Sequence, residues 1–138
     1  MTILLDTCIV IDALQKREPF FKNAQSIFLS AANRLFVGYL TAKSISDVYY
    51  LMHHVTHSDS ESRDLISKLL MLFELVDTQG LDCINALASP ISDFEDAIMV
   101  ETAKRECIDY IVTRNVSDYV NSSIPVLSPD DFLKNLNN

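Results

Sequence analysis

The chain has 138 residues, 49% of them hydrophobic, which is enough to bury one core without disulfides or a structural metal. Eleven basic and nineteen acidic residues give a formal net charge of −8, which argues against binding nucleic acid by bulk electrostatic attraction. Glycine and proline are few, and no Ser-, Gly- or Pro-rich stretch or charge run marks a linker. A single domain over residues 1–138 is therefore expected.

The sequence also predicts a cytoplasmic protein. No apolar run approaches the roughly 20 residues of a membrane span, and the N-terminus lacks the basic start and continuous apolar core of a signal peptide. Cys8, Cys83 and Cys107 are far apart and form no CxxC pair. Buried free thiols are therefore favoured over a redox or zinc role.

The first third of the chain alternates between short apolar runs and amphipathic stretches. Residues 2–5 predict a buried strand that ends at Asp6, and residues 9–14 are expected to be helical. Residues 20–32 carry apolar side chains at helical spacing and predict a second helix. A strand is expected at residues 36–39.

The middle of the chain is mainly helical in pattern. From Ala42 to Val55 the apolar residues follow helical spacing, with Thr41 or Ser44 as the cap and Asp47 one residue off the apolar stripe. After a polar break at 57–62, the expected elements are a helix over 65–73, a strand over 74–76 and a helical segment over 82–87.

The last third begins with helix start signals at Pro90, Ser92 and Asp93. This helix is expected to run to about Cys107 and to bury one face, made of Asp96, Val100, Ala103 and Cys107. Strands at 110–113 and 126–127 and a closing helix at 129–136 complete the pattern. The alternation predicts an α/β fold with a parallel sheet covered on both faces.

Four aspartates fall at informative places in this pattern. Asp6 ends the first strand, Asp47 and Asp96 lie on helices, and Asp118 follows the strand at 110–113. Ligands of open α/β sheets bind outside the carboxyl ends of the strands, where Asp6 and Asp118 should both lie. Carboxylates gathered there repel one another unless a cation lies among them.

Each aspartate also has an ordinary structural explanation. The alternatives are a cap of the next helix for Asp6, an ion pair with Lys43 for Asp47, a favourable place at a helix N-terminus for Asp96 and a turn for Asp118. Together these explanations are weaker than a shared site, because the apolar run before Asp6 and the stripe that carries Asp96 are poor places for idle charge.

Four segments of the chain resemble PIN domains, particularly the VapC-like toxin branch of that family. They are LLDTCIVIDAL at 4–14, TAKSISDVYYLM at 41–52, SDFEDAIMVETAKRECIDYIVTRNVSDY at 92–119 and PVLSPDDFL at 125–133. The resemblance implies a three-layer α/β/α fold with a central, mainly parallel sheet. It also implies an endoribonuclease that depends on Mg²⁺ or Mn²⁺.

In that resemblance, Asp6, Asp47, Asp96 and Asp118 match the family's acidic positions, and Thr113 matches its Ser/Thr after the last core strand. Asp6 and Asp96 would bind metal directly, whereas Asp47 and Asp118 would bind it through water or orient the attacking water. The resemblance further implies an RNA substrate, an antitoxin protein that covers the acidic cleft, and a homodimer.

The chain departs from the commonest PIN pattern at two positions. Asp47 stands where most relatives have Glu, and Asn115 stands where many have Asp, which puts metal affinity and metal number in question. Arg114 and Lys43 are near the expected site; surface charge is favoured over phosphate binding for both. His53 and His57 have the spacing of a metal clip but lack a third ligand nearby, so ordinary helix-end histidines are favoured.

Two other functions stay open. Asp6 followed by Thr7 weakly resembles the aspartate-nucleophile motif of haloacid dehalogenase-like proteins, but Cys8 stands where that motif needs a second acid. The alternative favoured by Asp47 and Asn115 is a catalytically weak PIN-like module that binds RNA or a protein.

Overall fold

The computed structural model describes residues 1–138 and contains one sheet of five parallel strands in the order β3-β2-β1-β4-β5. The strands are β1 (Thr2–Leu5), β2 (Val37–Thr41), β3 (Glu74–Val76), β4 (Tyr110–Val112) and β5 (Val126–Leu127). β1 lies at the centre, with Leu4 opposite Tyr39 of β2 and Ile111 of β4. The expected parallel sheet is confirmed.

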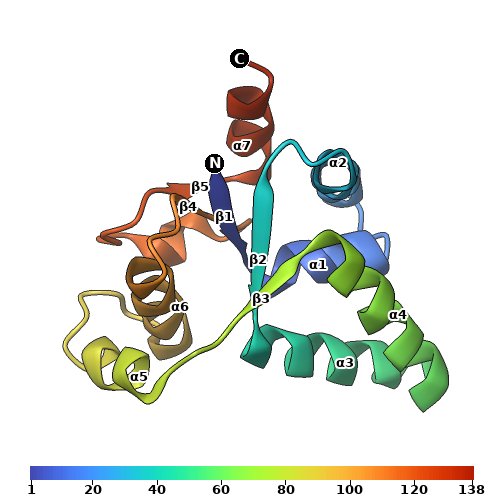
Figure 1. Ribbon diagram of the computed structural model, residues 1–138, viewed down its shortest axis with the longest axis horizontal. Helices are drawn as coiled ribbons and strands as arrows, with labels where there is room; N and C mark the ends of the chain where they lie inside the picture. Colours follow the sequence, from blue (N-terminus) through green and yellow to red (C-terminus); the bar gives the residue numbers. More distant parts are fainter.

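Seven α-helices and one short 3₁₀ helix connect and cover the strands. They are α1 (Thr7–Leu14), α2 (Phe21–Ala32), α3 (Ala42–Thr56), α4 (Asp59–Leu72), α5 (Gly80–Ala86), α6 (Phe94–Arg105), the 3₁₀ helix η1 (Val116–Tyr119) and α7 (Pro129–Leu136). Figure 1 shows α1 to α4 on one side of the sheet and α5 and α6 on the other. This is the three-layer α/β/α arrangement that the resemblance implied.

Two apolar clusters hold these layers together because the central strand is buried on both faces. Ile3 and Leu5 point into the larger cluster with α1 to α4 and α7, whereas Leu4 points into the smaller cluster with α6. All three side chains are completely buried. Such two-sided burial is typical of a parallel strand and explains the unbroken apolar run before Asp6.

Most helix boundaries agree with the sequence pattern within a few residues, but α4 begins six residues before the expected start. Ser58 caps it by accepting a hydrogen bond from the backbone N–H of Glu61. The first turn of α4 consists of polar residues, so it carries no apolar periodicity. None of the helices combines the length and apolar character that a membrane span needs.

The expectation of buried thiols is wrong. All three cysteines are free, but Cys8 and Cys83 are only partly buried and Cys107 is exposed. Cys107 leaves the expected α6 stripe because the helix ends at Arg105 and Cys107 has a left-handed backbone, with φ of 54°.

Candidate active site

Asp6 lies where β1 ends and α1 begins, at the carboxyl edge of the sheet. It is the N-cap residue of α1, but its side chain makes no capping hydrogen bond. Instead, its Oδ2 accepts a hydrogen bond of 2.8 Å from Oγ1 of Thr113, which directly follows the neighbouring strand β4. The explanation of Asp6 as an ordinary helix cap is therefore wrong.

A pocket of about 180 Å³ opens beside Asp6 at this edge of the sheet. Its walls come from the ends of β1 to β3, the start of α3, and α5 and α6, and include Asp6, Asp47, Glu95, Asp96, Lys43 and Cys83. Three of the four predicted aspartates therefore lie around one pocket. Asp118 is not part of its wall.

Asp96 is the third residue of α6, and its position in the first turn orients it toward the pocket. Partial burial raises its pKa to about 6; a hydrogen bond from Tyr119 acts against the rise, and the charges of Asp93, Asp6 and Asp118 add to it. Asp6, Asp96 and Asp118 are thus close enough to influence one another electrostatically, and a cation between them would relieve this repulsion.

The carboxylate of Asp47 forms an ion pair with Lys43. Nζ of Lys43 lies 2.8 Å from Oδ2 of Asp47 and 3.2 Å from Oε1 of Glu95, so Lys43 connects α3 with α6 across the pocket. The hydrogen bond to Asp47 contributes most to raising the pKa of Lys43. The pairing of Asp47 with Lys43, one of the alternatives in the sequence, is therefore present.

Thr113 and Asp118 lie on the segment that follows β4. Thr113 is completely buried, and its Oγ1 also accepts a hydrogen bond of 3.0 Å from the backbone N–H of Asn115. Asp118 is exposed on η1, where its N–H donates to the carbonyl of Asn115. The sequence did not predict η1, because four residues are too few to show a helical period.

Arg114 does not have the solvated role favoured from the sequence. Its guanidinium donates to both oxygens of the buried Asp12, at 2.6 and 3.3 Å, and lies over the ring of Phe20 at 4.1 Å. Two of the guanidinium nitrogens, Nε and Nη2, are therefore bound to Asp12. The contact ties α1 to the segment that carries Thr113 and Asp118.

Several hydroxyl groups around Asp6 were missed by the sequence analysis. Oγ of the buried Ser44 accepts hydrogen bonds from Thr7 and from Thr41, which joins the start of α1 to the start of α3. The Tyr119 hydroxyl lies 3.4 Å from Oδ2 of Asp6. Hydroxyl residues are common on surfaces, so nothing in the sequence separated these from the others.

His53 lies in the last turn of α3, whereas His57 is the C-cap residue of that helix. The helix ends at Thr56, and His57 has a left-handed backbone that takes it off the helical face of His53. The His53 ring stacks on Tyr49 instead, with centroids 5.7 Å apart.

Residues 2–117 match a protein family described as PIN domain. The chain belongs to the PIN domain family. No curated protein matches the sequence at a significant level.

Solved structures with the same fold include components of toxin-antitoxin complexes. VapBC2 from Rickettsia felis, bound to a promoter DNA fragment, is similar with a TM-score of 0.67 at 14% identity, covering 93% of this chain and 98% of that one. A toxin-antitoxin complex from Klebsiella pneumoniae has a TM-score of 0.67 at 20% identity, with coverages of 92% and 97%. VapC20 from Mycobacterium tuberculosis, described as a sarcin-ricin loop cleaving toxin, has a TM-score of 0.65 at 10% identity, with coverages of 89% and 98%.

The donor chemistry of this PIN domain fits a hard divalent cation. Carboxylate oxygens are the ligands that Mg²⁺ prefers, and Asp6 and Asp96 have no basic partner of their own. The geometry is less complete, because no three acidic, histidine or cysteine side chains lie close enough together to enclose an ion. Lys43 already neutralises part of the pocket.

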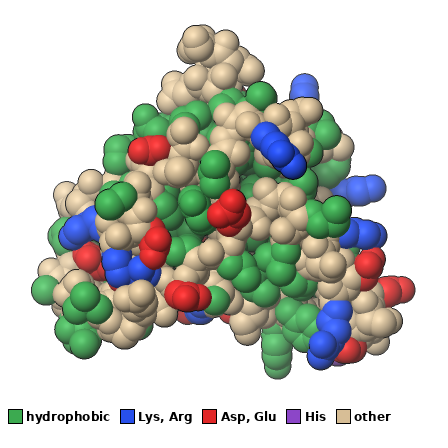
Figure 2. Space-filling view, in the orientation of Figure 1, with side chains coloured by type: hydrophobic (Ala, Val, Ile, Leu, Met, Phe, Trp, Pro, Cys, Tyr) green, Lys and Arg blue, Asp and Glu red, His purple; other side chains and the backbone are tan.

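The surface of the PIN domain agrees with its acidic composition. On the face in Figure 2, basic side chains are scattered, and several of them lie beside acidic ones. That face therefore has no continuous basic patch for a nucleic-acid backbone, and attraction to phosphate has to arise locally.

Proposed function

We propose that this PIN domain is a metal-dependent endoribonuclease and the toxin of a toxin-antitoxin pair. The observation that carries the proposal is the pocket in which Asp6 and Asp96, from distant parts of the chain, meet at the carboxyl edge of the sheet. The raised pKa of Asp96 supports it, because perturbed carboxyl groups in a pocket are typical of functional sites.

The proposal gives each predicted residue a role. Asp6 and Asp96 would hold Mg²⁺ or Mn²⁺, and Thr113 fixes the orientation of Asp6 through its 2.8 Å hydrogen bond. A bound ion would lower the pKa of a water and neutralise the phosphate. Asp118, which lies outside the pocket wall, would orient a water. Asp47 would join the site only after its ion pair with Lys43 is broken.

The partners follow from the surface as well as from the fold. An acidic pocket on a chain of net charge −8 suits a basic antitoxin segment. Exposed Leu81, Ile84 and Leu87 on or just after α5 are 55, 64 and 76% accessible, and such an apolar stripe supports a homodimer. We place the protein in the cytoplasm, where its RNA substrate is.

RNA cleavage tests the proposal directly. A labelled RNA pool is incubated with the wild type or with Asp6→Asn, each with Mg²⁺, Mn²⁺ or EDTA. We expect metal-dependent cutting by the wild type and at least a 100-fold loss in Asp6→Asn, roughly the effect of removing one important charge-stabilising group. Ser46→Ala, on the exposed part of α3, is the control and should cut normally.

A catalytically weak binding module is the second candidate, and the ion pairs of Lys43 favour it. The single positive charge of Lys43 offsets one of the two negative charges of Asp47 and Glu95 without any metal. Folded wild-type protein that binds RNA equally well in EDTA and in Mg²⁺, and cuts it in neither, would establish this candidate in place of the nuclease.

A further inference from the structure

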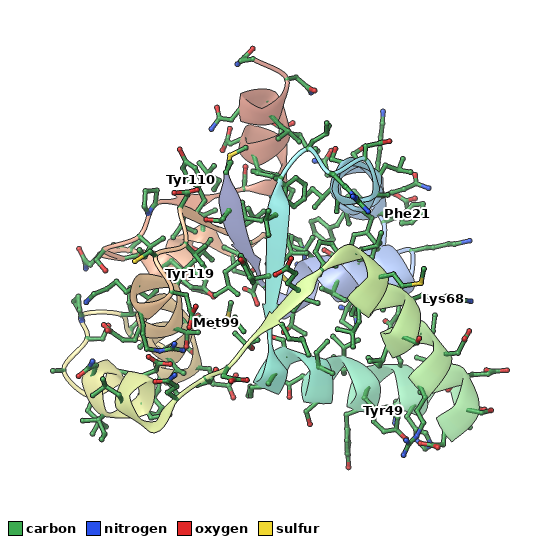
Figure 3. All side chains as sticks on the ribbon, viewed as in Figure 1. Phe21, Tyr49, Lys68, Met99, Tyr110 and Tyr119 are labelled. Atoms are coloured by element: carbon green, nitrogen blue, oxygen red, sulfur yellow. The ribbon has the colours of Figure 1, made fainter.

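Tyr119 is the last residue of η1 and directly follows Asp118. Its side chain is only 3% exposed and packs in the smaller core cluster with Val100 and Ile91. Figure 3 labels it together with Met99 of α6, and both lie on the α6 side of the sheet. The ring is therefore a core group, and its hydroxyl is the part that reaches the pocket.

The hydroxyl lies among acceptors from two elements of the site. It is 3.4 Å from Oδ2 of Asp6 at the end of β1 and 3.5 Å from Sδ of Met99 on α6. A buried phenol needs such a partner, and the carboxylate of Asp6 is the stronger acceptor of the two, because hydrogen bonds to charged groups are the strong ones.

Asp6 receives its hydrogen bonds on one side only. Thr113 at 2.8 Å and Tyr119 at 3.4 Å both donate to Oδ2, so neither donor occupies Oδ1. A carboxylate fixed through one oxygen leaves the other for a ligand. Hydrogen bonds to the far oxygen of a ligating carboxylate are the usual way in which proteins orient such groups.

We propose that Tyr119 is a positioning residue whose hydroxyl, together with that of Thr113, fixes the orientation of the Asp6 carboxylate for a divalent cation. This inference rests on the proposed metal-dependent function. Both hydroxyl groups donate to Oδ2 of Asp6, so loss of the Tyr119 hydroxyl leaves Thr113 as the remaining side-chain donor and frees the carboxylate to rotate.

The test uses Tyr119→Phe, which removes the hydroxyl and keeps the buried ring. Tyr49→Phe is the matched control, because its hydroxyl donates to the exposed Asp59. Mn²⁺ affinity is measured by electron paramagnetic resonance of the free ion, without RNA. Urea unfolding verifies that both variants are folded, and kcat and KM are measured on the RNA that the wild type cuts.

We expect Tyr119→Phe to weaken Mn²⁺ binding on the order of 10-fold and to lower kcat with little change in the KM for RNA, while Tyr49→Phe matches the wild type. Unchanged Mn²⁺ affinity in folded Tyr119→Phe would overturn the inference, as would a wild type that binds no Mn²⁺. A wild type that binds Mn²⁺ but cuts no RNA refutes the proposed nuclease alone, and the Mn²⁺ affinities then still decide the role of Tyr119.

Discussion

Asp96 has an ionisation that opposes folding. Its pKa is raised from 3.8 to about 6, chiefly by burial, so between these values the folded chain binds more protons than the unfolded chain. Stability must therefore fall as the pH rises through this window. Burial of an ionised Asp96 without a nearby cation lowers the free energy of unfolding, a cost that a residue with a purely structural role would not require.

Asp96→Asn should therefore stabilise the metal-free protein at pH 7.5. We expect a gain of about 1 kcal/mol, less than the full equivalent of the pKa shift because the side chain is partly exposed. Urea unfolding at pH 7.5 and pH 4.5 measures it, and the gain should shrink at pH 4.5, where Asp96 is already protonated. Equal stability of the two proteins at pH 7.5 would contradict this account.

The aspartates also show how far single residues can be interpreted from sequence. Asp6, Asp47, Asp96 and Asp118 were predicted to share a site, and the structure places the first three around one pocket. The ion pair of Lys43 with Glu95 and the bond of Arg114 to Asp12 are contacts between residues that lie up to 102 positions apart. Such pairs depend on tertiary packing, which local patterns do not contain.

At the scale of elements, β2 depends on a glycine. A Cβ on Gly38 would lie 2.6 Å from Cδ1 and 2.9 Å from Cε1 of Phe73, and 3.0 Å from Phe36. Phe73 cannot easily move, because it is buried and its ring packs edge-on against Phe28 at 5.1 Å. Because Gly38 has no side chain, Phe73, which connects α4 to β3, packs directly against β2.

Gly38→Ala should cost about 1–3 kcal/mol of unfolding free energy, the usual effect of overpacking a core. Gly80→Ala is the control at the start of α5, where an added Cβ meets nothing within 4 Å and the backbone has no positive φ. It should stabilise the protein by about 0.4–1 kcal/mol. Equal urea midpoints for the two variants would show that the space around Gly38 adapts.

The sequence indicated every strand and α-helix but missed the short η1 and the first turn of α4. The clearest signal came from β1, whose Ile3, Leu4 and Leu5 form a completely buried run. The early start of α4 was missed although Ser58 and Glu61 have the spacing of a helix N-terminus. The exposed Cys107 was missed because nothing local signalled the end of α6 at Arg105.

At the scale of the whole molecule, the fold extends beyond the residues that match the PIN family. That match ends at residue 117, yet β5 pairs with β4, and α7 places Phe132 in the larger core cluster. Phe132 is completely buried, with its ring edge-on to Phe36 at 5.1 Å. The C-terminal segment therefore belongs to the folding unit.

Phe132→Ala should lower the free energy of unfolding by about 3–5 kcal/mol through lost burial and the cavity it leaves. Lys134→Ala removes only an exposed ion pair with Asp130 on the same helix and should change it by less than about 0.5 kcal/mol. Thermal and urea unfolding of both variants test this. A small effect of Phe132→Ala would mean that α7 is an appendage.

The central position of β1 has a consequence for synthesis on the ribosome. Asp6 is made first, but Thr113, which fixes it, follows 107 residues later. β1 also lacks its second neighbour in the sheet until β4 has been synthesised. A growing chain therefore has no assembled pocket until most of it has been translated, so any activity of the pocket begins only late in synthesis.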